Sequence, residues 1–420
     1  MGLFKKQRQK VVENVEVYSE HVWLRVVIVV ALILIGFGSL SYGLVSCLNR
    51  NNGWHEIELS TDCYEFAPEF SLNYNLGQEG ATATVEYNRI SELYSEVALK
   101  SYKVFDPYRE YKGIGNLASL SANINSEVSV DPLLYDAISL TLDREERHLF
   151  LAPLYIKNIE VCESIEDDEA SVNDPRADEI AAEYYSDVMQ FVSSDEHIKL
   201  ELKGNGKVIL VVSDEYKAFA EDNGIDALVD FHWLRNAFMV DAIADKLISE
   251  GYTLGNVSSY NGFRRNLDKS GQSYDVSMFT LIDKVRYPAA TLRLGDFSSV
   301  VNFRSFPLTS VYTCDDYTYF AYKDGRVVSP YLSYSDGFDR CAVPSLMSVS
   351  SEKSCADTAL EIYRYFSADS FDTDGINSLL SNGIKSVWVV DETVYYNDDT
   401  LKPVELYSDD DYKFRAEKIK

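Results

Sequence analysis

The sequence predicts an α+β protein whose large folded body follows a short apolar segment. Of its 420 residues, 46% are hydrophobic, a share typical of a folded chain rather than a disordered one. Stretches with helical periodicity dominate the first half of the body, and short β-branched stretches divided by Asp, Gly or Pro dominate the second half. A body of about 350 residues is large for a single core, so we expect two lobes.

Composition argues against two classes of function. The chain carries 39 Lys and Arg against 67 Asp and Glu, a formal net charge of −28, and this charge repels phosphate backbones. Nonspecific binding to nucleic acid is therefore not expected. The six cysteines show no C-x-x-C spacing and no His pair accompanies them, so a zinc site is not expected either.

An apolar run near the N-terminus predicts a membrane segment. No charged residue occurs between Arg25 and Arg50, which leaves enough residues for the roughly 20 needed to cross a bilayer. Basic residues precede the run and an acidic chain follows it, so the positive-inside rule places the N-terminus in the cytoplasm and the body outside. We expect a cytoplasmic stretch at 1–25, a membrane segment at 26–48 and a spacer at 49–65.

The end of this run is open to two interpretations. Leu44-Val-Ser-Cys47 places small residues before a cysteine, as a bacterial lipoprotein signal does, and Cys47 would then carry lipid and become the mature N-terminus. However, roughly 25 residues precede the apolar run, which is long for the charged region of a cleaved signal. We favour an uncleaved single-span anchor, with the lipoprotein as the alternative.

The first half of the body combines both periodicities. Alternation predicts strands, spacings of three and four predict helices, and Asp131 with Pro132 gives one helix a defined start. In chain order we expect a strand at 81–87, a helix at 90–98, an aromatic loop at 105–117, a helix at 133–142, a buried loop or short strand at 148–156, a helix at 178–191, a hairpin of 198–202 with 208–212, and a helix at 215–221.

The stretch 227–252 combines the signals of a buried strand, a tight connection and a helix. From Val240 onward apolar residues recur at spacings of three and four, and the helix is expected to stop at Gly251, because glycine enters the left-handed conformation with least strain. A helix that starts so soon after a strand points several free N–H groups at one spot. An anionic ligand can bind at such a spot.

The second half of the body is mostly β. Asp324-Gly325 is a strong hairpin turn signal between two of its stretches. We expect strands at 277–282, 290–294, 299–303 and 347–350, a hairpin of 311–322 with 326–328, a helix at 354–366, and a last hairpin of 383–390 with 393–396.

Three regions in order carry a resemblance to a known family. The first is the Tyr-rich loop 105–117 followed by Val128-Ser-Val-Asp-Pro132, which is similar to a loop and an Asn that precede V-x-V-D. The second is Phe231 to Asp241, which is similar to L-G-G-I-A-K-G-Y-A-V-D. The third runs from Asp324-Gly325 to Ala356-Asp357, and is similar to the series D-G, H-I-I-D-P-x-T-G, S-V and A-D-A-x-x-T. Together, from about 66 to 366, they resemble the FAD:protein FMN transferases, the ApbE family.

The resemblance implies an ApbE-like, two-lobed ectodomain at 66–420 on the outer face of the cytoplasmic membrane. The family reaction is the Mg²⁺-dependent transfer of FMN from FAD to a threonine of a flavoprotein acceptor, in which the metal neutralises charge on the pyrophosphate. It implies FAD and Mg²⁺ as cofactors but assigns no catalytic residue here. The implied contacts to the cofactor are Asn116, Asn236 and Gly337, and the implied metal ligand is Asp357. Two further candidates follow from residue chemistry: Arg264, after Gly262, as a bidentate donor to phosphate, and Glu361, four residues after Asp357 on one helix face, as a second metal ligand. The alternatives are local pairing of Arg264 with Asp or Glu and a solvated helix face for Asp357 and Glu361.

Several positions depart from the family pattern. The two Gly of the second motif fall on His232 and Trp233, its Lys falls on Asn236, and the last Thr falls on Glu361. Bulky side chains thus replace the glycines that would let a phosphate come close to the backbone, and we expect His232 to be buried and structural. The departures predict weak or lost transferase activity. The alternative is a non-catalytic, membrane-anchored binding or scaffold protein, a pseudoenzyme that keeps the fold.

Overall fold

A computed structural model of the chain describes residues 22–48, 50–60, 63, 69–78, 80–144, 146–268, 271–307 and 319–419. The chain divides into two compact units, residues 1–51 and residues 52–420. The body therefore forms one compact unit where the sequence predicted two lobes.

In the first unit, helix α1 spans Val22–Leu48. Among its described side chains, Trp23, Leu34 and Phe37 are exposed. Within the described part of the chain, no helix combines the length and the apolarity needed to cross a membrane.

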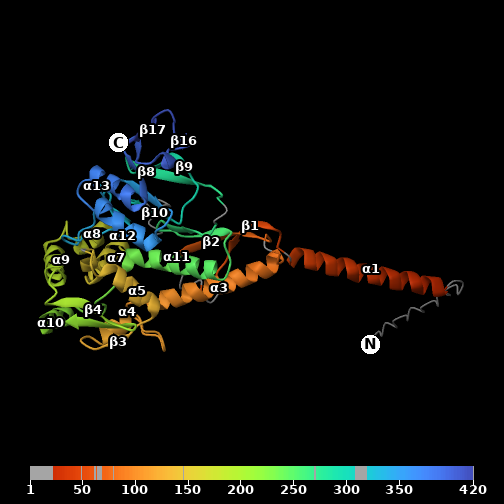
Figure 1. Ribbon diagram of the computed structural model, residues 1–420, viewed down its shortest axis with the longest axis horizontal. Helices are drawn as coiled ribbons and strands as arrows, with labels where there is room; N and C mark the ends of the chain where they lie inside the picture. Colours follow the sequence, from red (N-terminus) through yellow and green to blue (C-terminus); the bar gives the residue numbers. More distant parts are fainter. Residues whose placement is uncertain are drawn as a thin grey trace, which may run out of the picture. The chain divides into compact units, whose positions relative to one another are not determined.

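A nine-stranded sheet forms the centre of the second unit, in the order β1-β2-β6-β7-β10-β13-β14-β15-β17 (Figure 1). Neighbouring strands are antiparallel except β15 and β17, which are parallel. The strands are β1 (Gly53–Ile57), β2 (Phe70–Leu76), β6 (Gly255–Ser259), β7 (Phe263–Asn266), β10 (Ser299–Arg304), β13 (Ser345–Ser350), β14 (Ile384–Val390), β15 (Thr393–Tyr396) and β17 (Arg415–Lys418). The predicted spacer is thus partly wrong, because β1 lies within it and pairs with β2.

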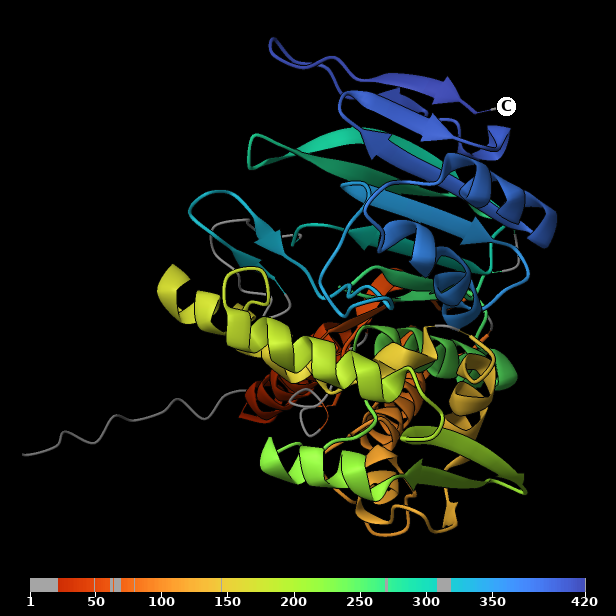
Figure 2. The same cartoon turned by 90° about the vertical axis from the view of Figure 1, so that its left-hand side faces the viewer.

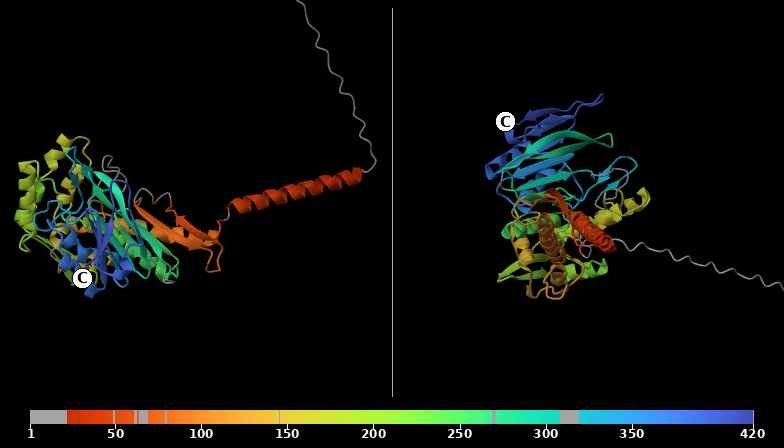
Figure 3. Two further views of the ribbon diagram at one scale, coloured as in Figure 1. Left: turned by 90° about the horizontal axis from the view of Figure 1, so that it is seen from above. Right: turned by 90° about the vertical axis from the view of Figure 1, so that its right-hand side faces the viewer.

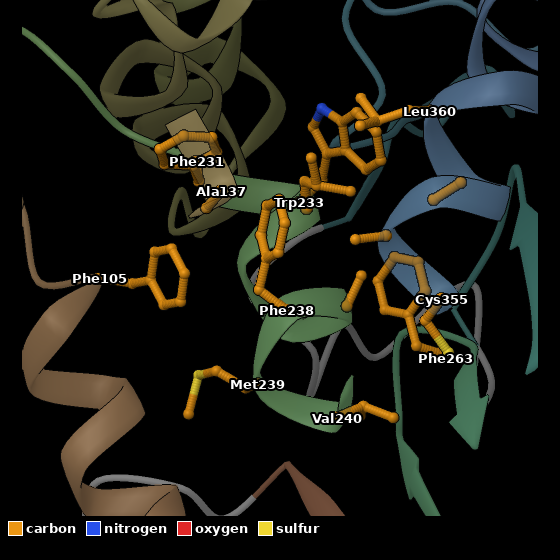
Figure 4. Packing of buried hydrophobic residues seen from close by; sticks show 14 of the residues in the cluster. Phe105, Ala137, Phe231, Trp233, Phe238, Met239, Val240, Phe263, Cys355 and Leu360 are labelled. Carbon is orange, nitrogen blue, oxygen red and sulfur yellow. The ribbon is translucent and has the colours of Figure 1, made fainter. Parts of the chain in front are cut away.

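Three long helices, α3 (Ala83–Val104), α11 (His232–Ser249) and α12 (Cys355–Phe366), pack on one face of this sheet. Figure 4 shows side chains of α11, such as Phe238 and Val240, between Phe105 at the end of α3 and Phe263 of β7. The strand predicted at 81–87 is wrong. Thr82 caps α3 instead, and buried residues recur along that helix at helical spacing because one of its faces packs on the core.

A second, smaller sheet covers part of the opposite face. It has the order β16-β9-β8 and comprises β8 (Tyr274–Ile282), β9 (Val285–Leu294) and β16 (Glu405–Leu406). Its apolar residues, with Met278 and Leu292 among them, join those of β10, β13, β14 and β15 in a separate core cluster. The predicted strands at 277–282, 290–294 and 299–303 are confirmed.

A three-stranded sheet, β3-β5-β4, lies at the bottom of Figure 2, while the C-terminal strands, coloured blue, lie at its top. The views in Figure 3 show the same layers from two other sides. The remaining elements of the second unit are α4 (Leu117–Ala122), β3 (Val128–Ser129), α5 (Pro132–Thr141), α6 (Arg147–Phe150), α7 (Leu154–Cys162), α8 (Asp167–Asn173), α9 (Glu179–Val192), β4 (Ile198–Gly204), β5 (Lys207–Val212), α10 (Asp214–Asp222), β11 (Phe320–Ala321), β12 (Val327–Val328), α13 (Thr373–Ser378), η1 (Leu379–Asn382) and η2 (Asp399–Leu401).

Most of the predicted local structure is found. The hairpin of β4 and β5, the helix α5 with Asp131 as its N-cap and Pro132 in its first turn, and the hairpin of β14 and β15 are confirmed. The loop or strand predicted at 148–156 is wrong, because these residues belong to α6, α7 and the turn between them. Of the predicted hairpin of 311–322 with 326–328, β11 pairs with β12, and residues 311–318 lie outside the described residues.

Candidate functional site

The start of α11 differs from the prediction. The residues before it, 227–231, form no strand, and the helix begins at His232. Phe231 is fully buried and its ring stacks on that of Phe150, with 4.9 Å between the ring centroids. The apolar run is thus a buried connection between helices, for which a short hydrophobic stretch carries the same signal as for a strand.

Local polar contacts hold this helix start. Phe231, the N-cap, makes no capping bond with its side chain. The carboxylate of Asp230 instead accepts a hydrogen bond from the N–H of His232 at 2.8 Å. His232 has a φ of 20°, outside the usual helical range. Glycine would adopt this backbone with less strain, as the resemblance implies for this position.

Two stacked ring pairs occupy the space at the helix start. The ring of His232 lies on that of Tyr155 of α7, with 4.2 Å between centroids and 6° between planes. The indole of Trp233 lies on the ring of Tyr363 of α12, with 4.0 Å and 5°. Both pairs bring α11 into contact with another helix, so the bulky residues that replace the two Gly fill space within the protein.

Three buried polar atoms in this region have no hydrogen-bond partner within the described part of the chain. They are His232 Nδ1, Arg235 Nε and Asn236 Oδ1. Buried polar groups are nearly always paired, and each unpaired one costs about 1–3 kcal/mol. Their concentration at one helix start makes it the candidate site, because such groups mark functional positions or sites of bound solvent.

Burial keeps this site uncharged at His232. Burial, with a smaller contribution from Arg235, lowers the pKa of His232 to about 3. Burial also raises the pKa of Asp230. At neutral pH the imidazole is therefore neutral, and it brings no positive charge to a phosphate.

Further along the same helix, Asp241 is a buried carboxylate with several partners. Its two oxygens accept the N–H groups of Cys355 and Ala356, each at 2.9 Å, and Arg265 donates to it at 2.8 Å. Burial raises the pKa of Asp241, while Arg265 and the two N–H groups act in the opposite direction. Asp241 therefore ties α11 to β7 and to the first turn of α12.

The two asparagines of the predicted cofactor set have structural bonds. Asn116 caps α4, and its amide nitrogen donates to the carbonyl oxygens of Lys103, Asp106 and Arg109. All of its donor capacity is thus used inside the protein. Asn236 donates to the carboxylate of Glu69 and belongs to the candidate site.

The other two predicted cofactor contacts are Arg264 of β7 and Gly337, which lies beside the first residue of α7. Arg264 precedes Arg265 on β7, and neighbouring residues of a strand point to opposite faces of the sheet. Since Arg265 bonds to α11, Arg264 lies on the other face of the sheet. Gly337 has a φ of 77° in a turn beside Leu154, and an added Cβ would collide with that side chain.

The two predicted metal ligands each have an internal partner. Asp357 completes the cap of α12, since its N–H and one carboxylate oxygen both bond to Ser354 Oγ. Glu361 pairs with Arg144 at 3.2 Å. Within the described residues, no three His, Cys, Asp or Glu side chains come together in a way that would hold a metal ion. Because water and substrate phosphate oxygens complete the ligand shell of Mg²⁺, two carboxylates are enough for a site, but here both would have to share their internal bonds with the ion.

Comparison with known proteins gives the fold. No protein-family model and no curated protein matches the sequence. The ApbE protein from Thermotoga maritima matches with a TM-score of 0.53 and 12% identity, over 80% of this chain and 94% of that one. The flavin transferase ApbE from Vibrio cholerae matches with a TM-score of 0.51 and 13% identity, over 81% and 94% of the two chains. The chain therefore has an ApbE-like mixed α+β fold.

Proposed function

We propose that this chain is a flavin-transferase-like protein at the outer face of the cytoplasmic membrane, in which FMN transfer is weak or lost and the fold serves binding. The fold similarity supports the first part of the proposal. The observation that carries the second part is the pair of ring stacks at the start of α11. Because fold does not fix function, the side chains at this position decide the proposal.

The ring stacks oppose the binding of a pyrophosphate at the helix start. A phosphate binds to a helix N-terminus when small residues let it approach the free N–H groups. Here the N–H of His232 is already bonded to Asp230, and the side chains of His232 and Trp233 pack on neighbouring helices. A pyrophosphate at this position would have to displace these contacts.

The predicted metal ligands already have internal partners. Magnesium, when bound, would neutralise the pyrophosphate and polarise the reacting phosphorus. Asp357 and Glu361, the predicted ligands, each commit an oxygen to an internal bond. A magnesium ion at these residues would have to share both carboxylates with Ser354 and Arg144.

Incubation of the purified full-length chain with FAD, Mg²⁺ and a flavoprotein that carries an acceptor threonine tests the proposal. We expect no covalent flavin fluorescence on the acceptor above that of a reaction without the chain, while an active transferase labels it in parallel. Labelling at a rate similar to that of the active enzyme would overturn the proposal. Titration of the chain with FAD in the same buffer separates a flavin-binding pseudoenzyme from a scaffold that does not bind flavin.

The proposed location rests on the charge-free run between Arg25 and Arg50. We expect the chain to stay with membranes after an alkaline wash, with its body accessible to protease from the outside. Substitution Cys47→Ser separates the two kinds of anchor, because it abolishes lipid labelling only if Cys47 carries lipid. Recovery of the wild-type chain in the soluble fraction would contradict the proposed location.

A further inference from the structure

One face of the central sheet is divided into two unlike halves. Over β10, β13, β14 and β15 this face is apolar, and the sheet of β8 and β9 covers it. Over β1, β2, β6 and β7 the same face carries polar side chains and one tryptophan, a surface called here the polar sheet face. Its residues are Trp54, Glu56, Ser71, Asn73, Asn75, Asn256, Ser258, Arg264 and Asn266.

Strand pairing places these side chains next to one another. Arg264 of β7 lies opposite Ser258 of β6, and Asn256 lies opposite both Asn73 and Asn266. Residues directly opposite in antiparallel strands have Cβ atoms about 5 Å apart and share a face. The side chains of the polar sheet face are therefore neighbours, and Asn256 and Asn266 are buried among them.

Arg264 is one of several described arginines without a carboxylate partner, but Arg109 and Arg286 lie over aromatic rings, and Arg304 and Arg415 donate hydrogen bonds to oxygen atoms of Tyr260 and Thr393. Ten other arginines each pair with a carboxylate. Within the described residues Arg264 forms neither an ion pair nor a hydrogen bond through its side chain, although the side chain is largely covered. Burial lowers the pKa of Arg264, and the hydroxyl of Tyr274 is the group that opposes this effect. A half-buried cation without a counter-ion is costly, so an anion supplied from outside would stabilise it.

Polar groups near Arg264 are also without internal partners. The side chains of Asn75, Asn256 and Ser258 form no hydrogen bond within the described part of the chain, although they lie between the edge strand β1 and Arg264 on the polar sheet face. They offer amide and hydroxyl groups that both donate and accept. Such groups match a ligand that carries several hydroxyls.

Aromatic rings border the same surface. The ring of Trp54 is 47% exposed and meets that of Tyr274 edge-on, at 6.0 Å between centroids. Tyr274 is the first residue of β8 and packs in turn on Phe297. A half-exposed indole beside unpaired amides offers an apolar surface for the carbon-bound hydrogens of a sugar ring.

We propose that the polar sheet face binds a small saccharide that carries one carboxylate or phosphate. Arg264 holds the anionic group, Asn75, Asn256 and Ser258 hold hydroxyls, and Trp54 covers one side of the sugar ring. Glu56, on the same face, opposes an anion, but it accepts a hydrogen bond from Ser71 at 3.0 Å and its strand is separated from that of Arg264 by β2 and β6. This site lies on the opposite face of the sheet from α11, so it does not depend on the proposed function.

Isothermal titration of the purified full-length chain with glucuronate, glucose 6-phosphate, glucose and inorganic phosphate tests the proposal. We expect at least one of the two anionic sugars to bind at least about tenfold more tightly than glucose and inorganic phosphate, because a hydrogen bond to a charged group contributes about 1.5–3 kcal/mol. The first two ligands separate a carboxylate from a phosphate as the recognised group. The proposal would be overturned if glucose or inorganic phosphate bound as tightly as the anionic sugars, or if neither anionic sugar bound.

Matched variants locate the site. Arg264→Gln should weaken binding of the anionic sugar about tenfold or more and leave the melting temperature unchanged or higher, because it removes an unpaired cation. Arg293→Gln, which breaks an exposed ion pair on β9, should leave binding unchanged. Asn256→Ala should weaken binding of the anionic sugar by a smaller factor than Arg264→Gln does. An affinity unaffected by Arg264→Gln in a folded variant would sink the assignment.

Discussion

Helix α11 carries two buried polar side chains, Asp241 and His232, which differ in how many hydrogen-bond partners they have. Asp241 accepts from two N–H groups and from Arg265, so its carboxylate is well compensated. The His232 ring is stacked on Tyr155, but its Nδ1 has no partner within the described residues. The middle of the helix is thus fixed by polar bonds and its start by ring packing. Asp241 belongs to the part of the helix that holds the fold together, whereas His232 belongs to the candidate site.

The largest expected effect is at Asp241. Asp241→Ala should lower the free energy of unfolding by about 4 kcal/mol, because it leaves Arg265 buried without its main partner and frees two N–H groups at the start of α12. Denaturant titration followed by circular dichroism measures it. Asp245→Ala is the matched control, since Asp245 also pairs with Arg265 but its side chain is 67% exposed, against 11% for Asp241. Equal losses of stability in the two variants would show that the burial of Asp241 does not make its ion pair with Arg265 more stabilising than that of Asp245.

At the helix start, packing should dominate. Trp233→Ala should lower the free energy of unfolding by about 3 kcal/mol, because it removes a buried ring stacked on Tyr363 and leaves a cavity. Trp54→Ala is the control, because the Trp54 ring is half exposed. The same denaturant titration compares them. A loss below about 1 kcal/mol for Trp233→Ala would mean that the site collapses around the smaller residue, and the ring stack would not be what fixes the helix start.

The pH dependence should distinguish His232 from a solvated histidine. The pKa of His232 in the folded chain is lowered to about 3, below about 6.5 in the unfolded chain. The unfolded state therefore binds the proton first, so the contribution of His232 to stability is complete above about pH 6.5 and is lost as the pH falls toward 3. Between pH 7 and pH 5 the wild type should lose about 2 kcal/mol more than His232→Phe, which keeps a ring for Tyr155 but does not titrate. Parallel losses in the two chains would place the imidazole in contact with water.

The smallest effect is expected at Asn236. Its amide nitrogen bonds to Glu69, whose side chain is 46% exposed, and its amide oxygen has no partner within the described residues. Asn236→Ala should change the free energy of unfolding by less than about 1 kcal/mol, because the loss of one hydrogen bond is offset by the removal of an unpaired oxygen and by the helix propensity of Ala. Thermal unfolding measured by calorimetry gives the change. A loss of several kcal/mol would show that the amide of Asn236 helps to hold the fold together, as the carboxylate of Asp241 does.

Local sequence signals determined much of the fold. Alternation and turn residues fixed the hairpins of β4 with β5 and of β14 with β15, and Asp131-Pro132 fixed the start of α5. These elements follow from bonds between residues close in the chain, which a sequence displays directly. Two errors occurred where burial hides the period. The mainly apolar residues around Phe150 and Phe231 carry the same signal in a strand, a helix or a buried connection.

The candidate site was only partly visible in the sequence. The motif around Asp241 and the bulk at His232 and Trp233 could be seen there, because both are substitutions within one continuous stretch. The partners of these residues could not be seen, since Tyr155, Tyr363 and Cys355 come from distant helices. The sequence also could not show on which face of the sheet Arg264 lies, because this depends on whether Arg264 or its neighbour Arg265 faces α11.

The sequence by itself therefore determined the α+β class, the order of most elements and the positions where a glycine-lined helix start is lost. Only the tertiary structure decided which of those positions touch, that Asp357 and Glu361 have internal partners, and that Arg264 lies without one on the opposite face of the sheet. The physical reason is range. Secondary structure follows from contacts between near neighbours in the chain, whereas the state of a buried polar group is set by residues that folding brings to it.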